Sequence, residues 1–316
     1  MQFLSPDKCH DSRRRIILAA GFFDGVHNGH RAILKAMVLK AVQCHATPAV
    51  FTFRNHPSEI LSPKNPKPLL QPPGLRLSTV KSFIKGIAKQ VEPVILAPRF
   101  TSAFASVTPN SFLEYLKKRL PGLDTVFCGE DWTFGKNAAG NPAFLKTAGL
   151  KAVTVPYAKY KNIRISSSRI RSALADGDLR LASAMLGRPW QLEGGIFSGK
   201  GLGTKLGFPT VNVSVDKSLA LPPLGVYHVK AAGCDAIANL GKAPTTGHDA
   251  WPTPVLEIHI LDFDRLAAPV KRKFTREKLQ TDFISFIRPE KKFASVGALA
   301  KQIAHDIAFC RSTLQN

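Results

Sequence analysis

Two histidines, His27 and His30, lie three residues apart where an apolar run gives way to a helical pattern. The run Arg15–Ala20 is typical of a buried strand, and apolar residues recur at helical spacing after it. A helix that begins there directs unpaired backbone N–H groups and the positive end of its dipole at an anion. Gly25 and Gly29 remove Cβ atoms that would obstruct a phosphate, and each imidazole can donate a hydrogen bond. The spacing therefore predicts a phosphate-binding turn, with a structural or solvated role for the histidines as the alternative.

A second candidate phosphate contact is the segment Ile165–Arg171, which reads ISSSRIR and opens an expected helix. The hydroxyls of Ser166 and Ser167 suit capping or phosphate contact. Arg169 and Arg171 add charge-assisted donors. One serine could serve only as the N-cap, but three serines followed by two arginines can hold a triphosphate.

A glycine-rich loop, residues 199–209, runs into an expected strand that begins with Thr210 and Asn212. Such a loop lets backbone N–H groups approach phosphates closely. Thr210 and Asn212 are hard oxygen donors two residues apart on one strand face, which suits Mg²⁺. The alternative is an ordinary turn threonine and asparagine. A P-loop is excluded because Gly201 occupies the place of the required Ser or Thr.

Glu257 is the fourth feature with chemical potential. It stands between Leu256 and Ile258, so on an alternating strand it faces away from both. A carboxylate so placed suits a general base. The alternative is a solvated carboxylate on the outer face of a barrel.

The elements that must position these residues fall into two groups. Up to about residue 185, short apolar runs alternate with helical patterns, as in a parallel α/β sheet. We expect strands at 15–22, 48–53, 92–97, 124–129 and 151–156, helices near 29–44, 77–89, 109–119, 142–148 and 167–186, and a Pro-rich functional loop at 55–73.

After residues 186–190 the pattern changes to strands separated by turns rich in Gly and Pro, which predicts a closed or nearly closed antiparallel β-barrel. A final amphipathic helix, about 295–314, is expected to direct five apolar side chains at the barrel. The strands are expected at 191–198, 210–215, 225–232, 235–240, 254–261 and 280–287, and the five side chains are Val296, Leu299, Ile303, Ile307 and Phe309.

Composition narrows the class of protein. A chain of 316 residues is long enough for two domains, and its five scattered cysteines form no C-x-x-C pair, which argues against a disulfide framework and a structural zinc site. No signal peptide or run of some twenty apolar residues is present, so we expect a cytoplasmic protein without membrane association. The net charge of +22 would attract polyanions, but the basic residues follow no nucleic-acid-binding motif, so small-molecule substrates are the expected partners. A weak homo-oligomer is left open.

The first two motifs together resemble the nucleotidylyltransferase superfamily, in which an H-x-G-H turn and an I-S-S-x-x-[IV]-R helix start hold ATP. Phe51–Pro57 (FTFRNHP) and Gly129–Gly135 (GEDWTFG) are further similar to segments of the FAD synthetase module of bacterial bifunctional riboflavin kinase/FAD synthetases. The resemblance implies a Rossmann-like α/β nucleotidylyltransferase domain over residues 14–185. His56 in the first of these segments is as consistent with packing in its loop as with catalysis.

The resemblance also implies an activity and residue roles for this domain. The module joins FMN to the AMP part of ATP and releases pyrophosphate, with Mg²⁺ bridging phosphate oxygens. His27, His30 and Arg169 take the catalytic roles by this resemblance, and Gly21, Phe23, Asp24, Gly29, Ser166 and Ser167 the binding roles. Phe22 departs from the family, which more often has Asn before F-D-G.

The string G-F-P-T-x-N resembles the riboflavin kinase module, which implies that residues 186–316 form an antiparallel β-barrel domain with a C-terminal helix. Thr210 and Asn212 would then reach Mg²⁺ and nucleotide phosphate, and Glu257 would take the proton from the ribityl 5′-hydroxyl of riboflavin. The implied binding residues are Gly199, Gly203, Lys205, Gly207, Pro209, Asn239 and Arg288. Leu202, Thr204 and Phe274–Arg276 depart from the family pattern.

Both resemblances together predict a bifunctional enzyme that makes FMN from riboflavin and ATP and then FAD from FMN and ATP. One alternative is a nucleotidylyltransferase for another phosphorylated acceptor, with a degenerate barrel. The other is a non-enzymatic protein that binds flavin or nucleic acid.

Overall fold

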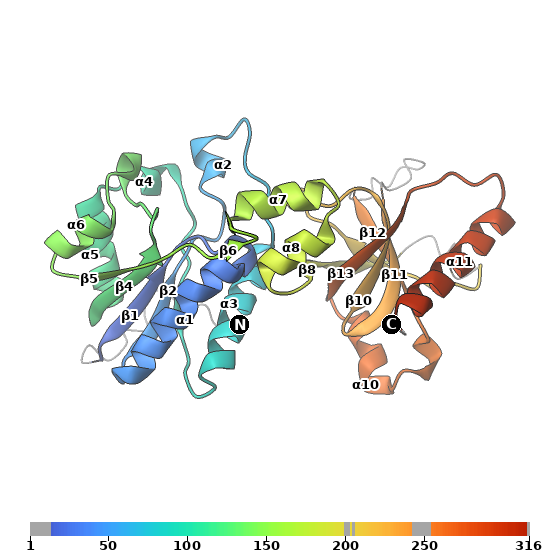
Figure 1. Cartoon of the computed structure of the whole chain (residues 1–316), viewed down its shortest axis with the longest axis horizontal. Helices are drawn as coiled ribbons and strands as arrows, with labels where there is room; N and C mark the ends of the chain where they lie inside the picture. The colour runs from blue at the N-terminus through green and yellow to red at the C-terminus, as the bar shows by residue number, and fades with distance from the viewer. Residues whose placement is uncertain (1–13, 199–202, 204–205, 242–253, 315–316) are drawn as a thin grey trace. The chain divides into compact units, whose positions relative to one another are not determined.

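The structure, a computed structural model, describes residues 14–198, 203, 206–241 and 254–314 (Figure 1). The chain forms two compact units, each described below by itself. The first comprises Met1–Leu69 and Pro73–Ser167, and the second comprises Leu70–Pro72 and Ser168–Asn316. The domain boundary proposed at residues 185/186 stays a prediction.

The first unit is built on a parallel sheet with strand order β3-β2-β1-β4-β5. The chain order reverses between β1 and β4, and ligands bind at such a switch point, outside the carboxyl ends of the strands. The strands are β1 (Ile16–Ala20), β2 (Thr47–Phe51), β3 (Val94–Leu96), β4 (Leu123–Gly129) and β5 (Lys151–Val155).

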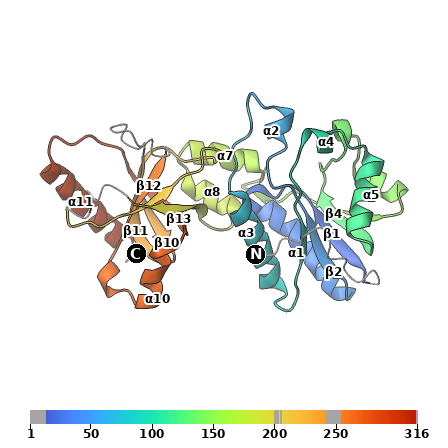
Figure 2. The same cartoon turned by 180° about the vertical axis from the view of Figure 1, so that it is seen from behind.

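Helices cover both faces of this sheet (Figures 1 and 2). Ile17 of β1 packs with α1 and α3 in one apolar cluster, whereas its neighbour Leu18 packs with α5 and α6 in another. This alternation follows from the period of two along a strand, and it makes β1 a fully buried central strand. The helices are α1 (Asn28–Gln43), α2 (Ser58–Leu61), α3 (Pro73–Ile87), α4 (Ser102–Ala105), α5 (Pro109–Arg119) and α6 (Pro142–Thr147).

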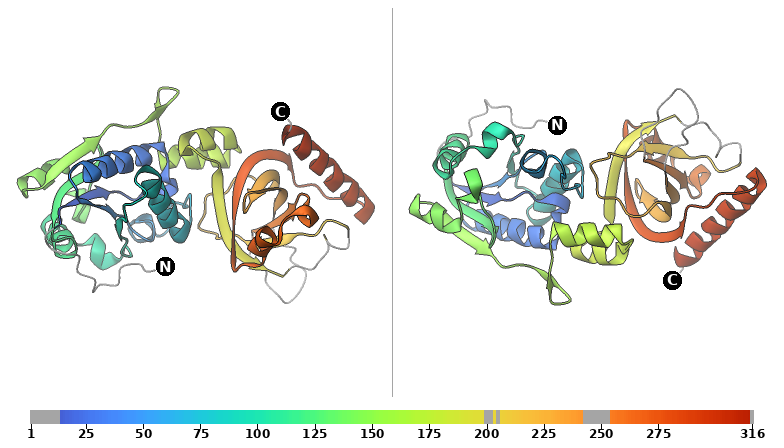
Figure 3. Two further views of the ribbon diagram at one scale, coloured as in Figure 1. Left: turned by 90° about the horizontal axis from the view of Figure 1, so that it is seen from below. Right: turned by 90° about the horizontal axis from the view of Figure 1, so that it is seen from above.

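The second unit contains a closed antiparallel barrel in the order β10-β11-β12-β9-β8-β13. Leu256 and Ile258 are fully buried inside it, and the rings of Trp190 and Tyr227 both contact Phe283. The strands are β8 (Trp190–Phe197), β9 (Val211–Ser214), β10 (Gly225–Ala231), β11 (Cys234–Gly241), β12 (Val255–Ile260) and β13 (Lys278–Pro289). The short helix α10 (Ala268–Lys271) precedes β13, and α11 (Val296–Leu314) lies along the outside of the barrel (Figure 3).

The structure confirms the expected fold class, a Rossmann-like α/β sheet followed by an antiparallel barrel and a C-terminal helix. The single helix expected over 167–186 is wrong: α7 (Ser167–Ala175) and α8 (Leu179–Leu186) are separate. Gly177 has φ +76° between them, and the Asp178 carboxylate caps α8 by accepting from the Leu181 amide at 2.8 Å. The hairpin β6 (Lys159–Tyr160) and β7 (Ile163–Arg164), α2 and α4 were not expected.

The expectation for the C-terminal helix is correct only in part. Ile303 and Ile307 pack with Cys310 against the barrel, but Val296 and Phe309 are exposed. Phe309 lies on the opposite side of the helix from the stripe that contains Ile303 and Ile307, and Val296 is the first residue of the helix.

Candidate active sites

The first unit has a cavity of about 300 Å³ at the carboxyl ends of β1, β4 and β5. Residues that directly follow these strands form its walls, as the switch point requires. Of the predicted residues, Gly21, Phe23, His27, Gly29, His30, Ser166 and Ser167 line it. Both predicted phosphate motifs therefore meet in one cavity.

His27 and His30 form a stacked pair at the start of α1. Their ring centroids are 3.5 Å apart, with 15° between the planes. His27 caps the helix, because its Nδ1 accepts a hydrogen bond from the His30 backbone N–H at 3.2 Å. A neutral His27 therefore carries its proton on Nε2. Gly29 allows this arrangement, since a Cβ there would lie only 3.1 Å from the His27 ring.

The turn before the histidine pair has an unusual backbone. Phe23 and Val26 have φ values of +56° and +44°, which are rare for residues with a bulky side chain. Such strain persists only where surrounding contacts hold it. Here the Ser167 hydroxyl donates to the Asp24 carbonyl at 3.1 Å, and the Arg31 Nε donates to the Val26 carbonyl at 3.2 Å. The serine motif thus holds the histidine turn in place as well as lining the cavity.

His30 is uncharged at neutral pH. Burial, the neighbouring charge of His27 and the charge of Arg76 lower its pKa well below 6.5. Its Nδ1 is buried and has no hydrogen-bond partner among the described residues. His30 is therefore a source of a neutral N–H donor beside His27.

The opposite wall contains residues that sequence reasoning missed. Arg164 donates to Asp131 at 2.5 Å, and its guanidinium lies 3.5 Å from the centre of the Tyr157 ring. All three line the cavity. Asp131 lies within the GEDWTFG segment, and Arg164 directly precedes the serine motif. Their positions in or beside these motifs could have identified both residues from the sequence. Tyr157 lies just before the unexpected hairpin β6–β7 and Arg164 is the last residue of β7, so their meeting depends on this hairpin.

Asp24, His56 and Arg169, all singled out from the sequence, do not line this cavity. Asp24 lies within the turn but is buried, and His56 packs edge-on against Phe22 at 4.7 Å between ring centres. Arg169 lies in α7 and belongs to the second unit, so its approach to the cavity stays a prediction.

The second unit has a cavity of about 560 Å³ on the outer face of the barrel. Strands β10, β11, β12 and β13 contribute residues to its lining, and so do α11, the chain after β13 and the segment that precedes β9. Of the predicted residues, Gly203, Thr210, Asn239, Glu257 and Arg288 line it. Gly207 and Pro209 do not line it, and Gly199 and Lys205 lie outside the described residues.

A row of polar side chains crosses three strands at this cavity. Glu257 of β12 is paired with Asn212 of β9 on one side and with Asn239 of β11 on the other. Directly paired residues project from the same face of a sheet, so the row faces outward while Leu256 and Ile258 fill the barrel. Asn212 is buried and does not itself line the cavity.

Glu257 has a raised pKa. Burial of the carboxylate against the protein is the main cause, and the charge of Glu290 adds to it. The side chain nevertheless stays accessible to water within the cavity. A carboxylate that is accessible and has a raised pKa suits proton abstraction. Glu290 and His259, which also line the cavity, were missed in the sequence.

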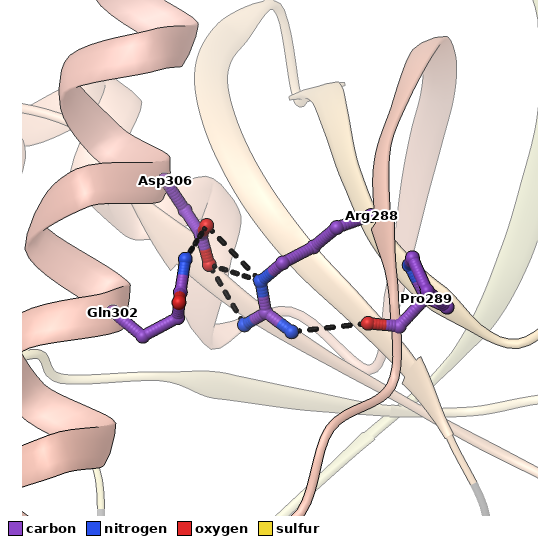
Figure 4. Close-up of polar contacts among 4 residues, drawn as sticks. All are labelled: Arg288, Pro289, Gln302 and Asp306. Atoms are coloured by element: carbon purple, nitrogen blue, oxygen red, sulfur yellow. Dashed lines mark hydrogen bonds and ion pairs between the residues drawn. The ribbon is translucent and has the colours of Figure 1, made fainter.

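Arg288, predicted to bind ligand, lies in the cavity wall but is held by α11 (Figure 4). Its Nε and Nη2 donate to the two carboxylate oxygens of Asp306 at 2.8 to 3.1 Å, and Gln302 donates to the same carboxylate at 2.9 Å. Asp306 is only 2% exposed. This bidentate pair fixes the helix that forms one wall of the cavity. A lone aspartate on the apolar face of α11 was the signal that could have revealed it.

These features define a class of protein: an enzyme with a nucleotidylyltransferase-type α/β site and a second site on a β-barrel. The FAD synthetase family model matches residues 9–169, and the riboflavin kinase model matches residues 186–314. A bifunctional riboflavin kinase/FMN adenylyltransferase from Bacillus subtilis is 31% identical over 309 residues, covering 94% of this chain and 92% of that protein. The Escherichia coli K12 protein of the same name is 31% identical over 301 residues, covering 92% of this chain and 90% of that protein. The chain belongs to the family of bifunctional riboflavin kinase/FMN adenylyltransferases.

A solved structure shares the fold. It is described as a macrolide-efflux protein from Streptococcus pneumoniae, has a TM-score of 0.79 and 26% identity, and the match covers 97% of this chain and 96% of that one. The described part of the present chain contains no helix of the length and apolarity needed to span a membrane.

Asp306→Asn should destabilise the barrel unit, because it leaves the half-buried Arg288 cation without its counter-charge. We expect a loss of about 3 kcal/mol in the free energy of unfolding, measured by urea denaturation. Arg311→Gln is the matched control, because it breaks an exposed pair from the same helix to Asp262 and should cost less than about 1 kcal/mol. Equal losses in both variants would show that the Arg288–Asp306 pair stabilises the unit no more than the exposed pair does.

Proposed function

We propose that this chain phosphorylates riboflavin at the barrel cavity and adenylylates the resulting FMN at the α/β cavity. The observation that carries the proposal is the presence of two separate cavities whose residues match the two chemistries. One has a stacked histidine pair and a serine motif at a helix start, and the other has an outward carboxylate between two asparagines.

In the adenylyl transfer, a phosphate oxygen of FMN attacks the α-phosphorus of ATP. The new P–O bond forms FAD, and the bond to the β-phosphate breaks and releases pyrophosphate. No covalent enzyme intermediate is needed, so the protein positions two anions and stabilises charge on the leaving group. His27 and His30 would donate N–H groups to these phosphates, and Ser166, Ser167 and Arg169 would bind the same chain of phosphates.

In the kinase reaction, the ribityl 5′-hydroxyl of riboflavin attacks the γ-phosphorus of ATP. The bond from that oxygen to phosphorus forms, the bond to ADP breaks, and Glu257 takes the hydroxyl proton. Gly203, Asn239 and Arg288 would complete the binding surface. Gly199, Lys205, Gly207 and Pro209 keep their predicted binding roles as part of the same loop.

The donor set fits a Mg²⁺ ion that shares its coordination with nucleotide phosphates. Thr210, which directly precedes β9, offers a hydroxyl, and Asn212 of β9 offers an amide oxygen beside the paired Glu257 carboxylate. Among the described residues no cluster of three His, Cys, Asp or Glu side chains forms a metal cage, so phosphate oxygens would complete the shell. The ion would neutralise charge on the transferring phosphate. Cys44, Cys128 and Cys234 are free thiols, which suits the cytoplasmic location expected from the sequence.

His30→Ala should stop FAD formation while FMN accumulates, because it removes one of the stacked donors without touching the barrel. We expect a loss of about 100-fold or more in FAD synthesis. Chromatographic separation of flavins after incubation with riboflavin, ATP and Mg²⁺ measures both steps. Equal loss of both activities in a folded variant would contradict the division between the two sites.

Glu257→Gln should lose kinase activity, by about 100-fold or more, yet still adenylylate supplied FMN. The amide keeps the size of the side chain but cannot accept the hydroxyl proton. The same assay measures this, with riboflavin or FMN as the starting flavin. Retained kinase activity would remove Glu257 from the role of base.

Glu290→Gln should shift the acid limb of the kinase pH profile to lower pH. The charge of Glu290 raises the pKa of Glu257 above 4.5, and the base is lost as pH falls through that raised pKa. Removing the charge lowers the pKa, so activity should persist to more acidic pH. Glu277→Gln, an exposed carboxylate that does not line the cavity, is the control and should leave the profile unchanged.

A further inference from the structure

Arg76 is a fully buried arginine of the first unit to which neither motif assigns a role. It lies near the start of α3 and none of its surface is exposed. Burial lowers the pKa of its guanidinium to about 10, so it stays cationic at neutral pH. A buried cation requires compensation or a function, because removing it from water costs free energy.

The contacts of Arg76 join three separate segments. Its Nη2 donates to the backbone carbonyls of Phe53 and of Arg54, the latter at 3.0 Å, in the FTFRNHP segment after β2. Its guanidinium lies 4.1 Å from the centre of the Phe22 ring, and Phe22 lines the adenylyl-transfer cavity. The negative charge of Asp24, in the strained turn, favours its charged form.

These contacts leave part of the hydrogen-bonding capacity of the guanidinium unused. Nε and Nη1 are buried and have no hydrogen-bond partner among the described residues. A buried arginine kept only for the fold would be expected to use these N–H groups. Its position beneath Phe22 and beside Asp24 instead relates it to the turn that carries the histidines.

We propose that Arg76 is a positioning residue for adenylyl transfer, which holds the strained histidine turn against the FTFRNHP segment through Phe22, Asp24 and two backbone carbonyls. The proposal rests on the proposed function of the α/β cavity. It gives Phe22, the departure from the family pattern, a specific use: its ring covers the guanidinium and separates it from the cavity.

The charge of Arg76 also acts on His30. The groups that influence His30 are His27 at the start of α1 and Arg76 from α3, with Asp131 and Arg164 on the opposite side of the cavity. Arg76 and His27 both disfavour a second positive charge there. A protonated His30 would lie at stacking distance from the His27 ring and would also be repelled by the charge of Arg76. Burial is the main cause of the lowered pKa of His30, and Arg76 adds to it.

Two variants separate the hydrogen bonds of Arg76 from its charge. Arg76→Met removes both, and Arg76→Lys keeps the charge but loses the planar fork that reaches two carbonyls. Lys81→Met is the control, because it removes a cation from the same helix that pairs with the exposed Glu92 instead. Each full-length variant is assayed for FMN and FAD formation, and the imidazole of His30 is titrated by NMR, assigned by its loss in His30→Ala.

We expect Arg76→Met to lower kcat for FAD synthesis by about 10- to 100-fold, as for a small misplacement of reacting groups. Kinase activity should stay unchanged, and the protonation midpoint of His30 should move upward. Arg76→Lys should lose part of the FAD activity with the midpoint near that of the unaltered chain, and Lys81→Met should change neither readout.

An unchanged His30 midpoint or undiminished FAD synthesis in Arg76→Met would overturn the proposal. If Arg76→Met does not fold, Arg76→Lys decides the matter, because full FAD activity in that variant would also overturn it. Failure of the unaltered chain to form any FAD would refute the proposed function instead, and the His30 titration would still report on Arg76.

Discussion

The α/β cavity, where we propose that adenylyl transfer takes place, depends on one strained turn. Phe23 and Val26 adopt left-handed backbone conformations between a fully buried strand and the helix that presents the histidines. This conformation places the His27 ring over Gly29, where it caps α1 and stacks on His30. The turn is held from one side by Ser167 and from another by the buried residues beneath it. The positions of the donors in the cavity therefore follow from how the surrounding contacts constrain this backbone.

The barrel site obeys a different constraint. The interior of the barrel is filled by apolar and aromatic side chains, so chemistry can take place only on its outer face. The strict alternation along β12 turns Glu257 outward, and the pairing of three strands places Asn212 and Asn239 beside it. An outer barrel face is open to solvent unless another element covers it. Helix α11, fixed by the Arg288–Asp306 pair, supplies that cover and turns an exposed row into a cavity.

Much of the architecture could be predicted because it depends on local periodicity. The strands of both sheets and the long helices follow apolar patterns that repeat every two or about 3.6 residues. The predictions failed where a single residue decides the outcome. Gly177 interrupts an apolar pattern that otherwise continues across α7 and α8. Phe309 is apolar and was therefore expected to face the barrel, but it does not lie on the buried side of α11. The hairpin β6–β7 has only two residues in each strand, too few for a pattern.

The sequence by itself indicated the class of chemistry, because the motifs that contain the paired histidines, the serines, Thr210 and Glu257 are local patterns of residue type and spacing. It also identified the order of the two domains. Only the tertiary structure decided which of these side chains share a cavity, that Asp24 is buried away from it and that Arg288 is engaged by α11. It alone revealed Arg76, since nothing about an arginine in a helix indicates burial. The physical reason is that burial, charge pairing and the sharing of a cavity depend on contacts between segments far apart in the chain, which no local pattern encodes.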